Sequence, residues 1–236
     1  NRLSSFSVKL QDKKFDEGHW RQQVVERYDL DHFEVELSEK DFVEALPKAT
    51  SIMEGPPPHF GCVMLMLLCE KIKDHGKVML TGEGADEIFG GYDRYSKWKQ
   101  LRHRGQVASI VPKKAWSFLS RYEGYHRFVG RDPAIWSSCY QDMKRVEALF
   151  PDLIFSAGAR STSAKRFSGF LDRMFAADQT VYLESLLLRQ DKMAMASSIE
   201  ARVPFCHLPL LREMNKLPHR IRVPGNDNKP LLKKIA

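Results

Sequence analysis

A glycine-rich stretch with several acidic residues is the part of the sequence best suited to chemistry. It reads TGEGADEIFGGY over residues 81–92. Gly82 and Gly84 allow unusual backbone angles and a close approach of the main chain to a ligand, and successive N–H groups in such a turn can bind phosphate oxygens. Glu83 and Asp86 would repel an anion unless a cation lay between, and Mg²⁺ prefers one or two carboxylates together with substrate phosphates. The pattern therefore predicts a metal–nucleotide site.

A structural role for the same acidic residues is the alternative. Asp86 could be the N-cap of a following helix, and the helix dipole would favour Glu87 in its first turn. Glu83 lies between two glycines, where no capping role suits it. The residues alone leave both interpretations of Asp86 open.

Strands and helices alternate before this loop. Strands are expected at residues 3–10, 32–38 and 77–81, and helices at 17–29, 39–53 and 60–76, with Ser38 or Asp41 as a cap and Gly76 as a stop. This order predicts an α/β fold with a parallel sheet and flanking helices. The strand 77–81, expected to be buried, runs directly into the glycine-rich loop, and ligands of such sheets bind beyond the carboxyl ends of the strands.

The pattern changes after residue 95. Segments such as FAADQTVYLESLLLRQDKMAMASSIEARV, residues 175–203, have helical spacing and no clear strand. We therefore expect two parts: an α/β nucleotide-binding part at residues 1–95, incomplete at its N-terminus, and an all-α half at 96–236 that packs on it.

Composition restricts the class of protein. The 236 residues are 43% hydrophobic and 28% charged, as in ordinary soluble domains. The longest apolar run, 60–69, is too short to span a bilayer, and four cysteines without regular spacing predict a reducing, cytoplasmic setting.

The formal net charge of +7 can be interpreted in three ways. Basic residues gather at 97–104, 219–223 and 229–234, which could form a nucleic-acid surface, attract a polyphosphate, or be solvated helix faces. No basic stretch interleaved with aromatic residues supports nucleic acid.

Four stretches resemble the asparagine synthetase family. The loop LTGEGADEIFGGYDRY is similar to the family signature S-G-E-G-x-D-E-x-F-G-G-Y, and LLLRQDKMAMASSIEARVPF at 186–205 to the later L-L-R-x-D-x-M-x-M-A-x-x-x-E-x-R-V-P-F. SFSVKL at 5–10 and KPLLKKIA at 229–236 are weaker matches in the same order. The resemblance extends over nearly the whole chain.

The resemblance implies an adenine nucleotide α-hydrolase-like fold and an ATP-dependent, Mg²⁺-requiring amide ligase. Family members activate a carboxylate as an acyl-adenylate and release pyrophosphate, after which ammonia or another amine displaces AMP. We expect a small-molecule or peptide carboxylate as substrate, ammonia from a glutaminase domain or another amine as donor, and no membrane partner. The resemblance leaves open whether the protein forms a homodimer or binds an associated chain.

Matching positions imply roles for individual residues. Val8 would contact the nucleotide, Thr81 and Gly82 would bind ATP, and Asp86 would hold Mg²⁺. Glu83 would orient or deprotonate the attacking amine, which requires hydrogen-bond reach. β-Lactam synthetases of the same family carry Tyr where this chain has Glu83, which favours intermolecular amide formation here.

The second motif is expected to be structural. Asp191 would cap the helix that starts at KMAM, and Arg202 would pair with Glu200 or another nearby carboxylate. Met193 and Met195 follow a helical apolar pattern, so we expect both in the core.

Several departures from the family pattern bear on function. The phosphate-binding S-G-G-x-D-S loop, expected before residue 3, is absent, as are a late lysine beyond 229–236 and a glutaminase domain; the nearest look-alike, FSAGARS at 155–161, lacks the aspartate. The chain is then a fragment, is completed by another chain, or is a non-catalytic nucleotide-binding or scaffold domain; we favour the fragment.

Other departures concern the substrate and metals. MEGPPPHFGCV at 53–63 replaces the family's E-T-Y-D-x-T-T-x-R-A-S, which puts aspartate as substrate in doubt. A metal site built from His59, Cys62, Cys206 and His207 is disfavoured, because buried cysteines commonly act as small hydrophobes.

Overall fold

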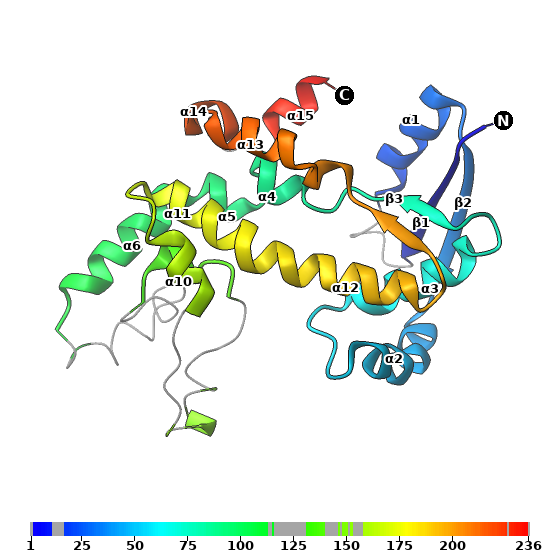
Figure 1. Cartoon of the computed structure of the whole chain (residues 1–236), viewed down its shortest axis with the longest axis horizontal. Helices are drawn as coiled ribbons and strands as arrows, with labels where there is room; N and C mark the ends of the chain where they lie inside the picture. Colours follow the sequence, from blue (N-terminus) through cyan, green and yellow to red (C-terminus); the bar gives the residue numbers. More distant parts are fainter. Residues whose placement is uncertain are drawn as a thin grey trace. The chain divides into compact units, whose positions relative to one another are not determined.

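The computed structural model divides into two units, each with its own core (Figure 1). Its described residues are 2–10, 17–112, 115, 131–139, 146, 148–150, 152, 158–225 and 227–235. Unit one comprises Asn1–Thr81 and Leu186–Arg202, and unit two comprises Gly82–Ser185 and Val203–Ala236. The glycine-rich loop therefore begins where unit one ends.

Unit one contains all the strands found among the described residues. Its elements are β1 (Ser4–Leu10), α1 (Gly18–Tyr28), β2 (Asp31–Leu37), α2 (Glu39–Met53), α3 (Gly61–Ile72), β3 (Val78–Leu80), most of α12 (Leu183–Met195) and β4 (Glu200–Arg202). The alternation of strands and helices predicted for this part of the chain is confirmed.

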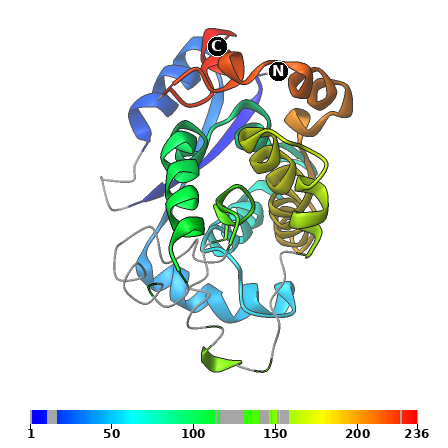
Figure 2. The same cartoon turned by 90° about the vertical axis from the view of Figure 1, so that its left-hand side faces the viewer.

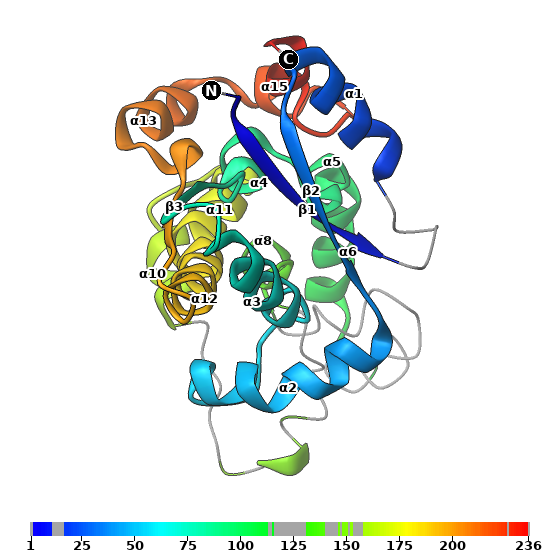
Figure 3. The same ribbon diagram turned by 90° about the vertical axis from the view of Figure 1, so that its right-hand side faces the viewer.

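Strands β1 and β2 form a two-stranded parallel sheet (Figure 3). Side chains alternate between its faces. On one face Phe6 stacks on Phe33 with ring centroids 5.1 Å apart, and Phe6 packs against buried residues of α3. On the other face Ser5 and His32 are joined by a hydrogen bond of 2.8 Å. The apolar face fixes the position of β1 on α3.

Helices α2 and α3 build the core of unit one. Ser38 caps α2 as predicted, because its side chain accepts from Asp41 N while the Asp41 carboxylate accepts from Ser38 N. This reciprocal arrangement satisfies two backbone donors of the first turn. Helix α3 buries five residues at helical spacing: Cys62, Val63, Met66, Cys69 and Ile72. It ends at Ile72, before the predicted stop at Gly76.

The single parallel sheet expected from the sequence is replaced by two sheets. Strand β3 pairs in parallel with β4, while β1 pairs with β2. The segment Glu200–Arg202 was expected to be helical, but it adds to β3 because the chain turns after α12 through Ser198, whose φ is 57°. Val78 and Leu80 are 46% and 69% exposed, so the prediction of a buried strand is wrong.

Unit two consists of helices and loops in its described residues (Figure 2). Its α-helices are α4 (Ala85–Phe89), α5 (Asp93–Ser96), α6 (Trp98–Ile110), α8 (Pro133–Trp136), α10 (Gly158–Ala164), α11 (Phe170–Ala177), α13 (Leu208–Lys216), α14 (His219–Arg222) and α15 (Pro230–Ile235). A π-helix, η2 (Asp178–Tyr182), continues α11, and a 3₁₀ helix, η3 (Pro204–Cys206), precedes α13.

A buried polar cluster lies inside unit two. Asp178 is 1% exposed and accepts hydrogen bonds from Arg94 Nη2 at 2.9 Å and Tyr95 Oη at 2.7 Å. Such a carboxylate is tolerated inside a protein because it is both ion-paired and hydrogen-bonded. The cluster connects α5 to the start of η2 and so supports the loop that precedes α5.

Some expectations fall partly outside the described residues. Parts of the helical half expected at 96–236, among them residues 116–130, and the start of FSAGARS lie there. The division into a nucleotide-binding part at 1–95 and a helical part at 96–236 stays a prediction. No helix in the described part of the chain is long and apolar enough to cross a membrane.

Candidate functional site

The chain leaves β3 and enters the glycine-rich loop at Thr81. Thr81 N donates to Arg202 O at 3.0 Å, which extends the β3–β4 pairing by one residue. Its hydroxyl donates to Oε1 of Gln190 at 3.0 Å, and Gln190 is buried on α12. Thr81 is therefore held in place within unit one, with its hydroxyl oxygen still able to accept a hydrogen bond.

Gly84 turns the loop into α4. It is the N-cap residue of α4 with φ 89° and ψ −15°, a conformation that glycine adopts without a steric cost. A Cβ at this position would lie 2.4 Å from Sγ of Cys206. The same Sγ contacts the loop again, because it donates to Glu83 O at 3.7 Å. Cys206, the last residue of η3, therefore packs against this turn.

Asp86 is not the N-cap of the helix. It is the second residue of α4, which has no side-chain cap, so the capping alternative for Asp86 is wrong. Its carbonyl accepts from Gly90 N and Gly91 N, each at 3.0 Å, and its carboxylate is 34% exposed. The side chain is therefore available for contacts beyond its own helix.

Lys229 is the partner of that carboxylate. Its Nζ lies 2.9 Å from Oδ1 of Asp86. A Cβ on Gly91 would lie 1.8 Å from the same Oδ1 and 2.5 Å from Cε of Lys229. Asp86 and Lys229 therefore meet over the bare backbone of Gly91, which explains physically why glycine occupies this position.

Glu87 has a different environment from its neighbour Asp86. It is 1% exposed, and Tyr92 Oη donates to its Oε1 at 2.6 Å. Burial raises the pKa of Glu87, while the hydrogen bond from Tyr92 opposes that rise. Glu87 is therefore a structural residue that fixes the end of the loop, and a contact with a solvent-borne ligand is excluded by its burial.

The remaining predicted site residues are distributed over both units. Glu83 is half-buried and Gly82 is exposed, both in unit two. Val8 belongs to unit one, where it is half-buried opposite Val35 in the β1–β2 register. The structure brings Asp86 together with Lys229, and Thr81 together with Gln190; roles for Val8, Gly82 and Glu83 stay predictions.

The second motif departs from expectation in two places. Arg202 Nε contacts Oε1 of Glu200 at 2.9 Å, as predicted. Asp191 does not cap a helix, because α12 begins at Leu183 and Asp191 is an exposed residue inside it. Met193 is fully buried, whereas Met195 is 54% exposed, so only one of the two predicted core methionines is in the core.

The described residues contain no group of three or more His, Cys, Asp or Glu side chains that could hold a metal. Cys62 is fully buried, and burial raises its pKa, so it acts as a small hydrophobe.

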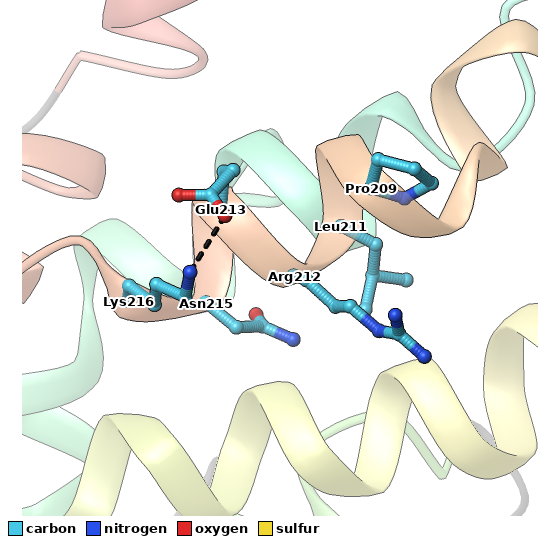
Figure 4. Close-up of a pocket in the computed structure, with 6 residues that line it drawn as sticks. All are labelled: Pro209, Leu211, Arg212, Glu213, Asn215 and Lys216. Atoms are coloured by element: carbon cyan, nitrogen blue, oxygen red, sulfur yellow. Dashed lines mark hydrogen bonds and ion pairs between the residues drawn. The ribbon is translucent and has the colours of Figure 1, made fainter.

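A pocket of about 530 Å³ lies along α13 (Figure 4). It is lined by Pro209, Leu211, Arg212, Glu213, Asn215 and Lys216. Glu213 and Lys216 form an ion pair of 2.6 Å within it, and Arg212 adds a further positive charge to the lining. The predicted site residues do not line this pocket.

Lys229 and Gln190 were missed as site residues by reasoning from the sequence. Each lies far along the chain from the loop residue that it contacts, so local spacing gives no signal for either contact. Lys229 does begin the stretch KPLLKKIA, whose family resemblance was the one sign that could have drawn attention to it.

Comparisons with known proteins give the family. The chain matches the asparagine synthase family over residues 1–236. It is 25% identical over 254 residues to asparagine synthetase [glutamine-hydrolyzing] 1 of Bacillus subtilis, covering 99% of this chain and 39% of the relative. It is 26% identical over 225 residues to asparagine synthetase [glutamine-hydrolyzing] 3 of the same organism, covering 93% of this chain and 33% of the relative.

The chain therefore belongs to the asparagine synthase family. It spans well under half the length of these curated relatives. The predicted family resemblance is confirmed.

Proposed function

We propose that the protein is an ATP-dependent, amide-forming ligase of the asparagine synthetase type. It activates a carboxylate as an acyl-adenylate with release of pyrophosphate, and ammonia or an amine then displaces AMP. The observation that carries this proposal is the carboxylate of Asp86, about one-third exposed, in a loop whose glycines match the family signature. An adenine nucleotide α-hydrolase-like fold is part of the same proposal.

Mg²⁺ fits this loop as an ion shared with phosphates. Asp86 supplies one hard oxygen donor, and the described residues offer no cluster of three acidic or imidazole ligands for a closed metal site. One or two carboxylates plus substrate phosphates is the usual protein environment of Mg²⁺. When bound, the ion would neutralise charge on the triphosphate, with Asp86 holding it.

The other predicted site residues take the roles that the family resemblance implies. Thr81 and Gly82 would contact ATP through hydroxyl and main chain, and Val8 would contact the nucleotide from β1. Glu83 would accept a proton from, or orient, the attacking amine. The side chain of Glu83 is half-buried, and its backbone carbonyl accepts a hydrogen bond from Sγ of Cys206. Both features support a defined orientation for a general base.

The acyl substrate is a carboxylate other than aspartate in this proposal. The segment 53–63 lacks the family's aspartate-binding pattern. Lys192 of α12 donates to Oε2 of Glu54 at 2.6 Å and to Met53 O at 3.3 Å. The Glu54 carboxylate is therefore paired with Lys192, which connects this segment to α12.

A non-catalytic nucleotide-binding or scaffold domain is the second candidate. The ligase proposal also predicts a cytoplasmic setting. It predicts a glutaminase domain or another amine as the nitrogen source, and it allows a second copy or an associated chain.

The experiment is a screen of carboxylic acids with the full-length protein. Aspartate, other amino acids, sugar acids and peptides are each incubated with Mg²⁺ and ATP, and AMP and pyrophosphate are measured. Formation of AMP that depends on one acid supports the ligase. Binding of ATP without AMP formation with any acid supports the scaffold.

A further inference from the structure

The contact between Asp86 and Lys229 joins two segments of unit two that are far apart in sequence. Lys229 precedes α15 and has φ 53°, a backbone conformation that non-glycine residues adopt at a cost. Its carbonyl accepts from Lys233 N at 3.0 Å, which begins the helix. The lysine is thus presented from the first turn of α15 by a constrained backbone.

Helix α15 is anchored independently of this ion pair. Leu231 and Leu232 pack against the cluster of Ile88, Phe89 and Met214, and Asn228 Nδ2 donates to Oδ1 of Asp93 at 3.0 Å. Loss of the ion pair would therefore leave the backbone of Lys229 in place. Only the side chain, with its flexible four-carbon stem, is free to move.

The ammonium and a metal ion compete for the same carboxylate. Nζ of Lys229 lies 2.9 Å from Oδ1 of Asp86, so a metal ion held by this carboxylate would be a second cation close to the ammonium. Two cations at such distances repel each other strongly. Because both side chains are about one-third exposed, the ion pair contributes little free energy and can open.

We propose that Lys229 is a positioning residue that pairs with the carboxylate of Asp86 until the nucleotide arrives. This inference rests on the proposed function. The ammonium holds the carboxylate over Gly91 and disfavours binding of a free divalent ion. The metal then enters together with the triphosphate, whose negative charge compensates for the displaced ammonium. Lys229 thereby favours entry of the metal together with the nucleotide over entry of the metal alone.

The test is Mn²⁺ binding to the full-length protein without nucleotide, measured by the electron paramagnetic resonance of free Mn²⁺. Lys229→Met is expected to bind Mn²⁺ about two- to fivefold more tightly than wild type, the range that corresponds to a partly exposed ion pair. Lys229→Arg keeps the charge and should stay near wild type. Lys233→Met is the matched control, because Lys233 lies on the same helix and pairs with Asp227 at 2.5 Å in an exposed bridge.

If Lys229 had a purely structural role, Lys229→Met would not bind Mn²⁺ more tightly than wild type. Unchanged or weaker Mn²⁺ binding by Lys229→Met, while Asp86→Asn still loses Mn²⁺, would overturn the role of Lys229 and leave the metal assignment standing. Unchanged Mn²⁺ binding by Asp86→Asn would instead overturn the metal assignment of the proposed function, and the inference with it. Thermal unfolding of each variant checks that the comparison is between folded proteins.

Discussion

Tyr92 and Glu87 are joined by a hydrogen bond of 2.6 Å in which the phenol donates to the carboxylate. Glu87 is 1% exposed, whereas the neighbouring Asp86 is about one-third exposed. Two adjacent acidic residues of one short helix therefore have separate roles. The buried one fixes the loop, and the exposed one can reach a ligand.

Glu87→Gln should change how stability depends on pH. Burial raises the pKa of Glu87 above its ordinary value of about 4.5, so the folded state binds this proton more tightly than the unfolded state. The stabilisation from the protonated carboxyl is complete below pH 4.5 and is lost as pH rises through the folded pKa. Gln keeps an acceptor for Tyr92 but cannot ionise, so the variant should gain stability relative to wild type as pH rises.

Urea unfolding of the full-length wild type and Glu87→Gln between about pH 4 and 8 measures this difference. The free energies of unfolding should diverge with increasing pH. Parallel curves over the whole range would show that the ionisation of Glu87 does not differ between the folded and unfolded states.

Gly84→Ala should destabilise the protein by about 2 kcal/mol or more. A left-handed backbone costs a residue with Cβ roughly 1–2 kcal/mol, and the new Cβ would lie 2.4 Å from Sγ of Cys206. Gly82→Ala is the control for stability, because no atom lies within 4 Å of its Cβ position. It should change stability by no more than about 0.5 kcal/mol.

A second variant separates the two causes at Gly84. Cys206→Ala removes the sulfur, so the double variant should recover part of the loss and retain the backbone strain. Thermal unfolding of the wild type, the three single variants and the double variant gives the values. Equal stability of Gly84→Ala and Gly82→Ala would contradict the tight turn against η3.

The sequence predicted those features that depend on neighbouring residues. Ser38 and Asp41 form a capping pair because they are three positions apart, and the apolar period of α3 matches its buried face. The position of the glycine-rich loop directly after β3 is likewise predictable, because the loop follows the strand in the sequence. Local spacing determines each of these features, and no distant partner is needed.

Features that depend on distant partners were not predictable in this way. β4 is a strand because β3 offers it backbone partners, although its own residues continue a helical pattern. Met195 follows the period of α12 but is exposed, since the helix ends there and the chain turns. Lys229 meets Asp86 only because α15 packs on α4.

Glu83→Gln should slow amide formation more than adenylation. A general base acts on the attacking amine and leaves the attack on ATP unaffected, and its loss typically costs a factor of about 10² to 10⁴. Carboxylate-dependent pyrophosphate exchange and amide product are measured on the same full-length variant. Equal losses in the two reactions would assign Glu83 to nucleotide binding instead.

The most direct test of the account is carboxylate-dependent ATP–pyrophosphate exchange by full-length Asp86→Asn. Asp74→Asn, which alters an exposed aspartate in the turn after α3, is the control. If Asp86 holds the metal of a metal–triphosphate complex, exchange should be abolished in Asp86→Asn and retained in Asp74→Asn. Exchange at the wild-type rate in Asp86→Asn would contradict the central claim that this carboxylate binds the metal of the nucleotide.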